Sequence, residues 1–235
     1  MKFDDSVWDR WMDSANKIKD DLQQTVEDQA IFCHFQKIVN DNYEWIEINH
    51  GNEFVWFVYD SYVHKAIMQI RRQIKNQNES HSFVRLLSQI KEYADQITYA
   101  YYLKRFPITK NEIPWQKRTF RILAKRNSDD YCRPIEEKTT ISSEMIDTHL
   151  KEIDELNKSI VDVADKFIAH NDRKRSPKNI EFEDLKKSID KFHDLFIKYY
   201  CFLTSDNYSS LESVITFPWQ KIFLVPLVKP KTDPS

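Results

Sequence analysis

The sequence contains a single glycine, Gly51, among its 235 residues. Glycine normally makes up about 7% of a protein, and β-rich folds depend on it in their tight turns. The shortage therefore predicts a mostly helical fold. With 41% hydrophobic residues, the chain is nevertheless able to bury a sizeable core.

Cysteines and long apolar runs are scarce as well. The three cysteines, Cys33, Cys132 and Cys201, are far apart and lack the spacing of metal ligands. They are interpreted as buried thiols in a reducing compartment. The sequence has no apolar run of about 18 residues or more and no N-terminal signal segment. We therefore expect a cytoplasmic protein with no membrane span.

Several functional classes lack their signals. The formal net charge is −2, so any nucleic-acid site must be local. The chain has no phosphate-binding P-loop, no GxGxxG, HExxH or GxSxG motif and no CxxC pair. The seven histidines show no pairing four residues apart, which argues against zinc. We expect neither a metal nor a cofactor.

Apolar residues recur every three or four positions over much of the chain, which is typical of amphipathic helices. The expected helices are 5–26, starting at a cap on Asp5 or Ser6, then 31–39, 53–75, 83–93 after Ser80 or Ser82, a long helix from Ser142 or Ser143, and 182–203. The first two form a helical hairpin or one bent helix.

The helix expected at 53–75 is the most apolar of these. Phe54 belongs to its buried side, and Phe57 widens that side, as expected of a central helix with neighbours on two sides. The tail at 214–228 contains two prolines and should be extended across the bundle, with a frayed end at 229–235.

The long helix that opens at Ser142 or Ser143 is the first candidate for a functional site. His170 lies three residues after Phe167, at the edge of the buried face. Its polar neighbours are Asp165, Lys166, Asn171 and Arg173. A histidine at a helix C-terminus, followed by positive charge, could transfer protons beside a bound phosphate. The alternative is a histidine that caps the helix before Pro177.

Arg71 and Arg72 occupy the last turns of the helix at 53–75. Arginines there commonly compensate the helix dipole. The competing interpretation is that one of them points into the same pocket as His170.

The segment 97–134 has a different character and reads as an insertion in a single domain that spans 1–235. It contains nine basic residues and only three acidic ones, interleaved with aromatic residues. Such a mixture suits a nucleic-acid backbone with unstacked bases. A basic stripe is formed by Lys117, Arg118, Arg121 and Lys125. The alternative is that the aromatic residues are core and the charges only a solvated face.

Three segments together resemble HEPN domains, most closely the abortive-infection type U proteins. They are FVWFVYDSYVHKAIMQIRRQIKNQNESHSFVRLLSQI at 54–90, ADKFIAHND at 164–172 and PWQKIF at 218–223. The resemblance implies an all-α, HEPN-like antiparallel helical bundle. The basic helical insertion and the extended C-terminal tail, which the composition indicates, would be additions to it. It also implies a homodimer, and many members are metal-independent ribonucleases of toxin–antitoxin or phage-defence systems.

The family signature is an arginine four to six residues before a histidine. His170 matches the histidine, but Ala164 stands where the arginine usually is, and Asp165 matches the polar residue that often follows it. The missing arginine leaves two hypotheses. Either Arg71, Arg72, Lys166 or Arg173 supplies the phosphate-binding cation for RNA cleavage, or the chain is a catalytically inactive module that binds RNA, a nucleotide, an antitoxin or another protein partner.

Overall fold

The computed structural model describes residues 3–77, 80–105, 132–134, 140–165, 180–204, 208–212, 215 and 218–224. Its elements are α1 (Asp5–Asp41), α2 (Tyr43–Ile48), α3 (Asn52–Ile74), α4 (Phe83–Glu92), the 3-10 helix η1 (Ala94–Gln96), α5 (Tyr99–Arg105), α7 (Ser143–Val163), α8 (Phe182–Thr204) and the 3-10 helix η4 (Trp219–Phe223). In these ranges β-structure is limited to one isolated bridge between Thr98 and Thr140. The expected all-α fold is confirmed.

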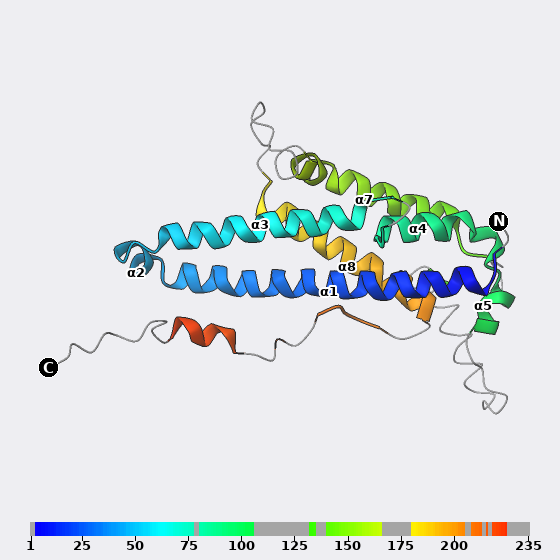
Figure 1. Cartoon of the computed structure of the whole chain (residues 1–235), viewed down its shortest axis with the longest axis horizontal. Coiled ribbons are helices and arrows are strands. Elements are labelled where there is room, and N and C mark those ends of the chain that lie inside the picture. The colour runs from blue at the N-terminus through cyan, green and yellow to red at the C-terminus, as the bar shows by residue number, and fades with distance from the viewer. Residues whose placement is uncertain are drawn as a thin grey trace.

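The bundle is elongated along α1 and α3, which run antiparallel and are joined through α2 (Figure 1). α4 and α7 lie beside the half of α1 and α3 that is remote from α2, and α8 crosses behind them. Contacts between α1 and α8, α3 and α7, and α4 and α7 hold this half together. The half next to α2 consists mainly of the α1–α3 pair, with η4 alongside α1.

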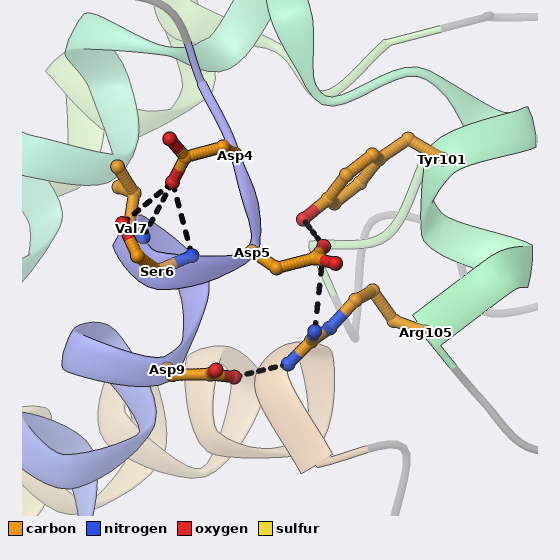
Figure 2. Close-up of polar contacts among 7 residues, drawn as sticks. All are labelled: Asp4, Asp5, Ser6, Val7, Asp9, Tyr101 and Arg105. Carbon is orange, nitrogen blue, oxygen red and sulfur yellow. Dashed lines mark hydrogen bonds and ion pairs between the residues drawn. The ribbon is translucent and has the colours of Figure 1, made fainter.

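α1 is one continuous helix of 37 residues, so it spans about 55 Å. The sequence predicted that the segments 5–26 and 31–39 form either a helical hairpin or one bent helix. The structure shows neither, because both segments belong to the continuous helix α1. The N-cap is Asp4, not Asp5 or Ser6, because the Asp4 carboxylate accepts the backbone N–H groups of Ser6 at 3.0 Å and Val7 at 3.2 Å (Figure 2). This cap satisfies donors that the first helical turn leaves free.

The core is rich in aromatic rings. Phe83 lies edge-on to three rings of α8, those of Phe192, Phe196 and Tyr199. At the N-terminal end of α1, Trp8 packs against Tyr102 and Phe202 and is 2% exposed. Edge-to-face and tilted pairs add to the free energy that comes from burying the rings.

The prediction that Phe54 and Phe57 belong to the buried side of α3 is wrong. Phe54 is 60% exposed and Phe57 is 67% exposed. The physical reason is the length of the α1–α3 pair, which extends beyond α4, α7 and α8 (Figure 1). Farther along α3, where those helices reach it, Ala66, Ile67 and Ile70 are buried as expected.

All three cysteines are free thiols. Cys132 and Cys201 are buried, as predicted, whereas Cys33 on α1 is only partly buried. In the part of the chain that the structure describes, no helix combines the length and the hydropathy that crossing a bilayer requires.

Candidate functional site

The first half of the candidate site is the C-terminal end of α7. The helix is capped by Ser142, whose hydroxyl accepts the Met145 backbone N–H at 3.1 Å, as one of the two predicted caps. It buries an apolar stripe that includes Ile153 and Ile160. A π-helical turn at 164–165 follows the last α-helical residue.

Ala164, which occupies the position of the family arginine, is completely buried. An arginine at this position would have to place its guanidinium inside the core, where an unpaired charge is strongly unfavourable. The absence of the arginine is therefore consistent with the packing of α7. Residue 164 therefore supplies no cation at this end of the helix.

α3 places an arginine beside this end of α7. The Nε atom of Arg71 lies 2.5 Å from Oδ1 of Asp165, so Arg71 donates a charge-assisted hydrogen bond across the two helices. The two residues are separated by 94 positions in the sequence. α3 and α7 pack against one another along this stretch, which fixes the distance between the ends that carry the two side chains.

Arg71 keeps donors for a further ligand. Its side chain is 31% exposed and that of Asp165 is 47% exposed, so the pair opens to solvent. Within the described residues the terminal amino groups of Arg71 have no hydrogen-bond partner. A planar guanidinium with free terminal donors can bind a phosphate in a bidentate manner.

Arg72 points to another part of the molecule. Its Nη1 atom is 2.9 Å from Oδ1 of Asp21 on α1. Adjacent residues on an α-helix are about 100° apart, so the two arginines cannot face the same partner helix. The structure brings Arg71, and not Arg72, to the end of α7.

Polar residues surround Arg72. A cavity of about 300 Å³ lies between α1 and α3. It is lined by Asp21, Gln24, Thr25, Lys65, Met68, Gln69, Arg72 and Gln73. At its edge the Asp28 carboxylate accepts hydrogen bonds from Lys65 at 2.7 Å and Gln69 at 3.0 Å. The acidic groups of α1 therefore neutralise the basic groups of α3 on this side.

Most of the predicted site lies outside the described residues. These residues are Lys166, His170, Asn171, Arg173, Lys117, Arg118, Arg121 and Lys125. Their predicted roles remain predictions. Asp165 is the described residue nearest to His170 in the sequence, five positions before it.

Two described arginines of the segment 97–134 have internal partners. Arg105 lies 2.5 Å from Asp9 and 3.4 Å from Asp5 on α1. Arg133 is buried and donates a hydrogen bond to the backbone carbonyl of Cys201 at 2.8 Å. Both side chains therefore stabilise the bundle, whereas the alternative interpretation of this segment expected its charges to form a solvated face.

His149 is a histidine that the sequence did not single out. It shares a 2.9 Å hydrogen bond with the Tyr199 hydroxyl between α7 and α8. Burial, together with the nearby Lys198, lowers the pKa of His149. Among the residues with described positions, no group of three or more histidine, cysteine, aspartate or glutamate side chains could hold a metal ion.

Helical periodicity could have favoured Arg71 over Arg72 before any coordinates. Arg71 lies four residues after Ile67 and therefore stays on the side of α3 that faces the core. The partner residue Asp165 could not have been identified in this way, because the contact joins elements that are far apart in the chain.

A comparison with protein-family models identifies one family. The model of the HEPN family AbiU2 matches residues 19–222, which covers most of the chain and includes both Arg71 and Asp165. Comparisons with curated proteins and with solved structures give no match. The extent of the family match and the all-α bundle agree with one another, and the chain therefore belongs to the AbiU2 family of HEPN proteins, a family of the abortive-infection type.

Proposed function

We propose that this protein is an RNA-targeting phage-defence protein of the toxin type and cleaves RNA without a metal ion. The observation that carries the proposal is the ion pair between Arg71 and Asp165. It provides a guanidinium whose terminal donors have no partner among the residues with described positions, at the end of α7 where this chain lacks the arginine of the family signature. His170, five residues after Asp165 in the sequence, is the proposed acid and base.

The proposed chemistry is an internal transfer at phosphorus. His170 takes the proton from a ribose 2′-hydroxyl, and the 2′-oxygen attacks the adjacent phosphate. The bond from phosphorus to the 5′-oxygen breaks, and the imidazolium returns a proton to that leaving oxygen. The products are a 2′,3′-cyclic phosphate and a 5′-hydroxyl. Arg71 would bind the phosphate and stabilise the charge that develops on its oxygens.

The remaining predicted residues would hold the substrate. Asn171 could hydrogen-bond the ribose or the phosphate, while Lys166 and Arg173 add positive charge. The basic stripe of the segment 97–134, formed by Lys117, Arg118, Arg121 and Lys125, would bind the RNA backbone away from the scissile bond. A homodimer would bring a second set of these groups across its two-fold axis, and an antitoxin is the expected partner of such an enzyme.

A second candidate function is a catalytically inactive module that binds RNA, a nucleotide or a protein partner. The observation in its favour is that Asp165 already neutralises Arg71. A guanidinium that is paired with a carboxylate attracts a phosphate less strongly than a free one. A protein with this function would have the same fold and the same basic segment, but it would catalyse no reaction.

The test is cleavage of mixed total RNA in EDTA by the wild type and four variants. His170→Ala should abolish cleavage, and Arg71→Gln should lower the rate by about 100- to 1000-fold, as expected when an oriented donor is lost. The control Arg10→Gln, an exposed residue of α1, should keep the wild-type rate. Arg72→Gln identifies the cation, because a loss equal to that of Arg71→Gln would contradict the assignment to Arg71.

Two outcomes would favour the inactive module. One is an absence of cleavage by every version, combined with RNA binding that weakens as salt rises. The other is cleavage that persists in His170→Ala, which would trace the activity to a contaminating enzyme. The products of any cleavage should end in a cyclic phosphate, and a 3′-hydroxyl end would exclude the proposed chemistry.

A further inference from the structure

The end of the bundle at α2 exposes an unusual number of large apolar side chains. We define the aromatic end as Tyr43, Trp45, Ile48, Phe54, Trp56 and Phe57. Each of them is between 54% and 72% exposed. Soluble monomers seldom leave so many large apolar residues together on the surface, and such patches commonly mark interaction sites.

The charge around the aromatic end has one sign. Residues 38–64 contain five carboxylates and neither lysine nor arginine. The carboxylates are Asp41, Glu44, Glu47, Glu53 and Asp60, and all five are exposed. Asp60 lies 3.4 Å from His64. The other four have no ion-pair partner among the residues with described positions, so their charge faces solvent.

A groove continues from the aromatic end between α1, α3 and η4. Its volume is about 350 Å³, and most of its walls are apolar. They are formed by Ile31, Phe32, Phe35, Phe54, Val58, Tyr62, Trp219 and Phe223, with Asp28, Ser61 and Lys65 as polar members. Phe54 belongs both to the groove and to the aromatic end, so the two surfaces are continuous.

Two polar atoms of this groove have no partner. The hydroxyl of Tyr62 and the indole N–H of Trp219 are buried and make no hydrogen bond within the described residues. An indole N–H can only donate, and a buried donor without an acceptor is unfavourable. An occupant whose apolar face also carries one oxygen acceptor, such as a serine hydroxyl, would remove this penalty.

We propose that the aromatic end and its groove form the docking surface for a cationic amphipathic helix of another protein. The apolar face of that helix would fill the groove, and its lysines and arginines would face the five carboxylates. This mode of recognition, an amphipathic helix in an apolar groove, recurs among protein complexes. Charge complementarity would add specificity and speed association.

The acidic charge selects this occupant over three others. RNA and anionic lipid surfaces carry negative charge and would be repelled. A second copy would place the same surface opposite itself in a two-fold dimer, so that Glu44, Glu47 and their neighbours would face like charges. A basic and apolar protein segment satisfies both features of the surface.

The aromatic end is separate from the proposed RNA site. Trp56 and Arg71 are 15 residues apart on α3, which corresponds to about 22 Å along the helix axis. A helix bound at the aromatic end could therefore occupy its site while the Arg71–Asp165 pair stays open. The proposal does not depend on whether the protein cleaves RNA.

The test uses a short synthetic amphipathic helix of leucine and lysine as the probe, with a leucine–glutamate helix of the same spacing as the comparison. Titration calorimetry should show that the lysine helix binds and that the glutamate helix does not. Glu44→Lys/Glu47→Lys should weaken binding about 10-fold or more, and so should Trp56→Gln/Phe57→Gln, as expected for central interface residues. Circular dichroism checks that each variant is folded.

The matched control is Asp154→Lys/Glu155→Lys, which makes the same change in net charge at exposed positions of α7. It should alter the affinity by less than about 2-fold. An equal loss in both double variants would overturn the proposal, since binding would then follow net charge alone. A dimer in sedimentation that Trp56→Gln/Phe57→Gln abolishes would also overturn it in favour of a second copy, and binding to neutral phosphatidylcholine vesicles would do so in favour of a membrane.

Discussion

Similar side chains are buried at one end of the α1 helix and exposed at the other. At the N-terminal end, aromatic rings are buried and charges are paired across elements (Figure 2). Asp5 accepts a hydrogen bond from the Tyr101 hydroxyl at 2.8 Å, and Arg105 contacts both Asp5 and Asp9. Arg105 also lies over the ring of Trp8, 5.7 Å from its centroid. The bundle itself satisfies these groups.

At the opposite end the same residue types face solvent. α2 has no side-chain cap and no buried residue. Tyr43 and Trp45 on this helix are 54% and 69% exposed. Helices α4, α5, α7 and α8 cover the N-terminal end and do not reach the end at α2 (Figure 1). The comparison indicates that one end stabilises the fold through buried rings and paired charges, whereas the other leaves its apolar area and its charge exposed.

Truncation of a tryptophan at each end gives the largest expected contrast. Trp8→Ala removes a ring that is 2% exposed and should lower the free energy of unfolding by about 3–5 kcal/mol. Trp45→Ala removes a ring that is 69% exposed and should change it by less than about 0.5 kcal/mol. Urea denaturation, followed by circular dichroism, measures both.

A total stability of about 5–15 kcal/mol is typical of a domain, so Trp8→Ala could fail to fold. Trp8→Phe would then show a smaller loss of the same sign. Equal losses for Trp8→Ala and Trp45→Ala would contradict the comparison, since both ends would then contribute alike to the fold.

Removal of Arg105 should have a moderate effect. Arg105→Ala breaks the ion pairs with Asp5 and Asp9 and the contact with the Trp8 ring. Because the Arg105 side chain is 23% exposed, we expect a loss of about 1 kcal/mol, which is partly screened by salt. The control Lys104→Ala changes an exposed neighbour on α5 and should leave the unfolding free energy unchanged. If Lys104→Ala lowered the unfolding free energy as much as Arg105→Ala, the loss would come from weakening helix α5 itself and not from the contacts of Arg105.

Helix positions could be predicted well from the sequence because periodicity reports which face of a helix is apolar. The expected helices at 53–75 and 182–203 agree closely with α3 (Asn52–Ile74) and α8 (Phe182–Thr204). Periodicity does not report whether another element covers that face. For this reason Phe54 and Phe57 were assigned to the core, although α4, α7 and α8 do not extend to this end of α3.

The candidate site could be predicted only in part, for the same physical reason. The sequence left open whether the missing arginine is replaced at all. It named Lys166 and Arg173 as candidates for the replacement, and on α3 it named Arg71 and Arg72. The choice between them depends on which helix packs against each side of α3. The Arg71–Asp165 contact joins residues 94 positions apart, and local patterns contain no information about such distances.

The smallest expected effect is the change in stability with pH, which should differ between the two ends of the bundle. Burial lowers the pKa of His149 at the covered end, so over the window below the ordinary value of 6.5 the unfolded chain binds a proton that the folded chain does not. Stability should therefore be full above that value and fall as the pH drops towards the lowered pKa. His149→Gln should remove this slope in urea denaturation between about pH 5 and pH 8. His64→Gln, at an exposed position of α3, should leave it in place, and a slope that survives in His149→Gln would assign the pH dependence to another group.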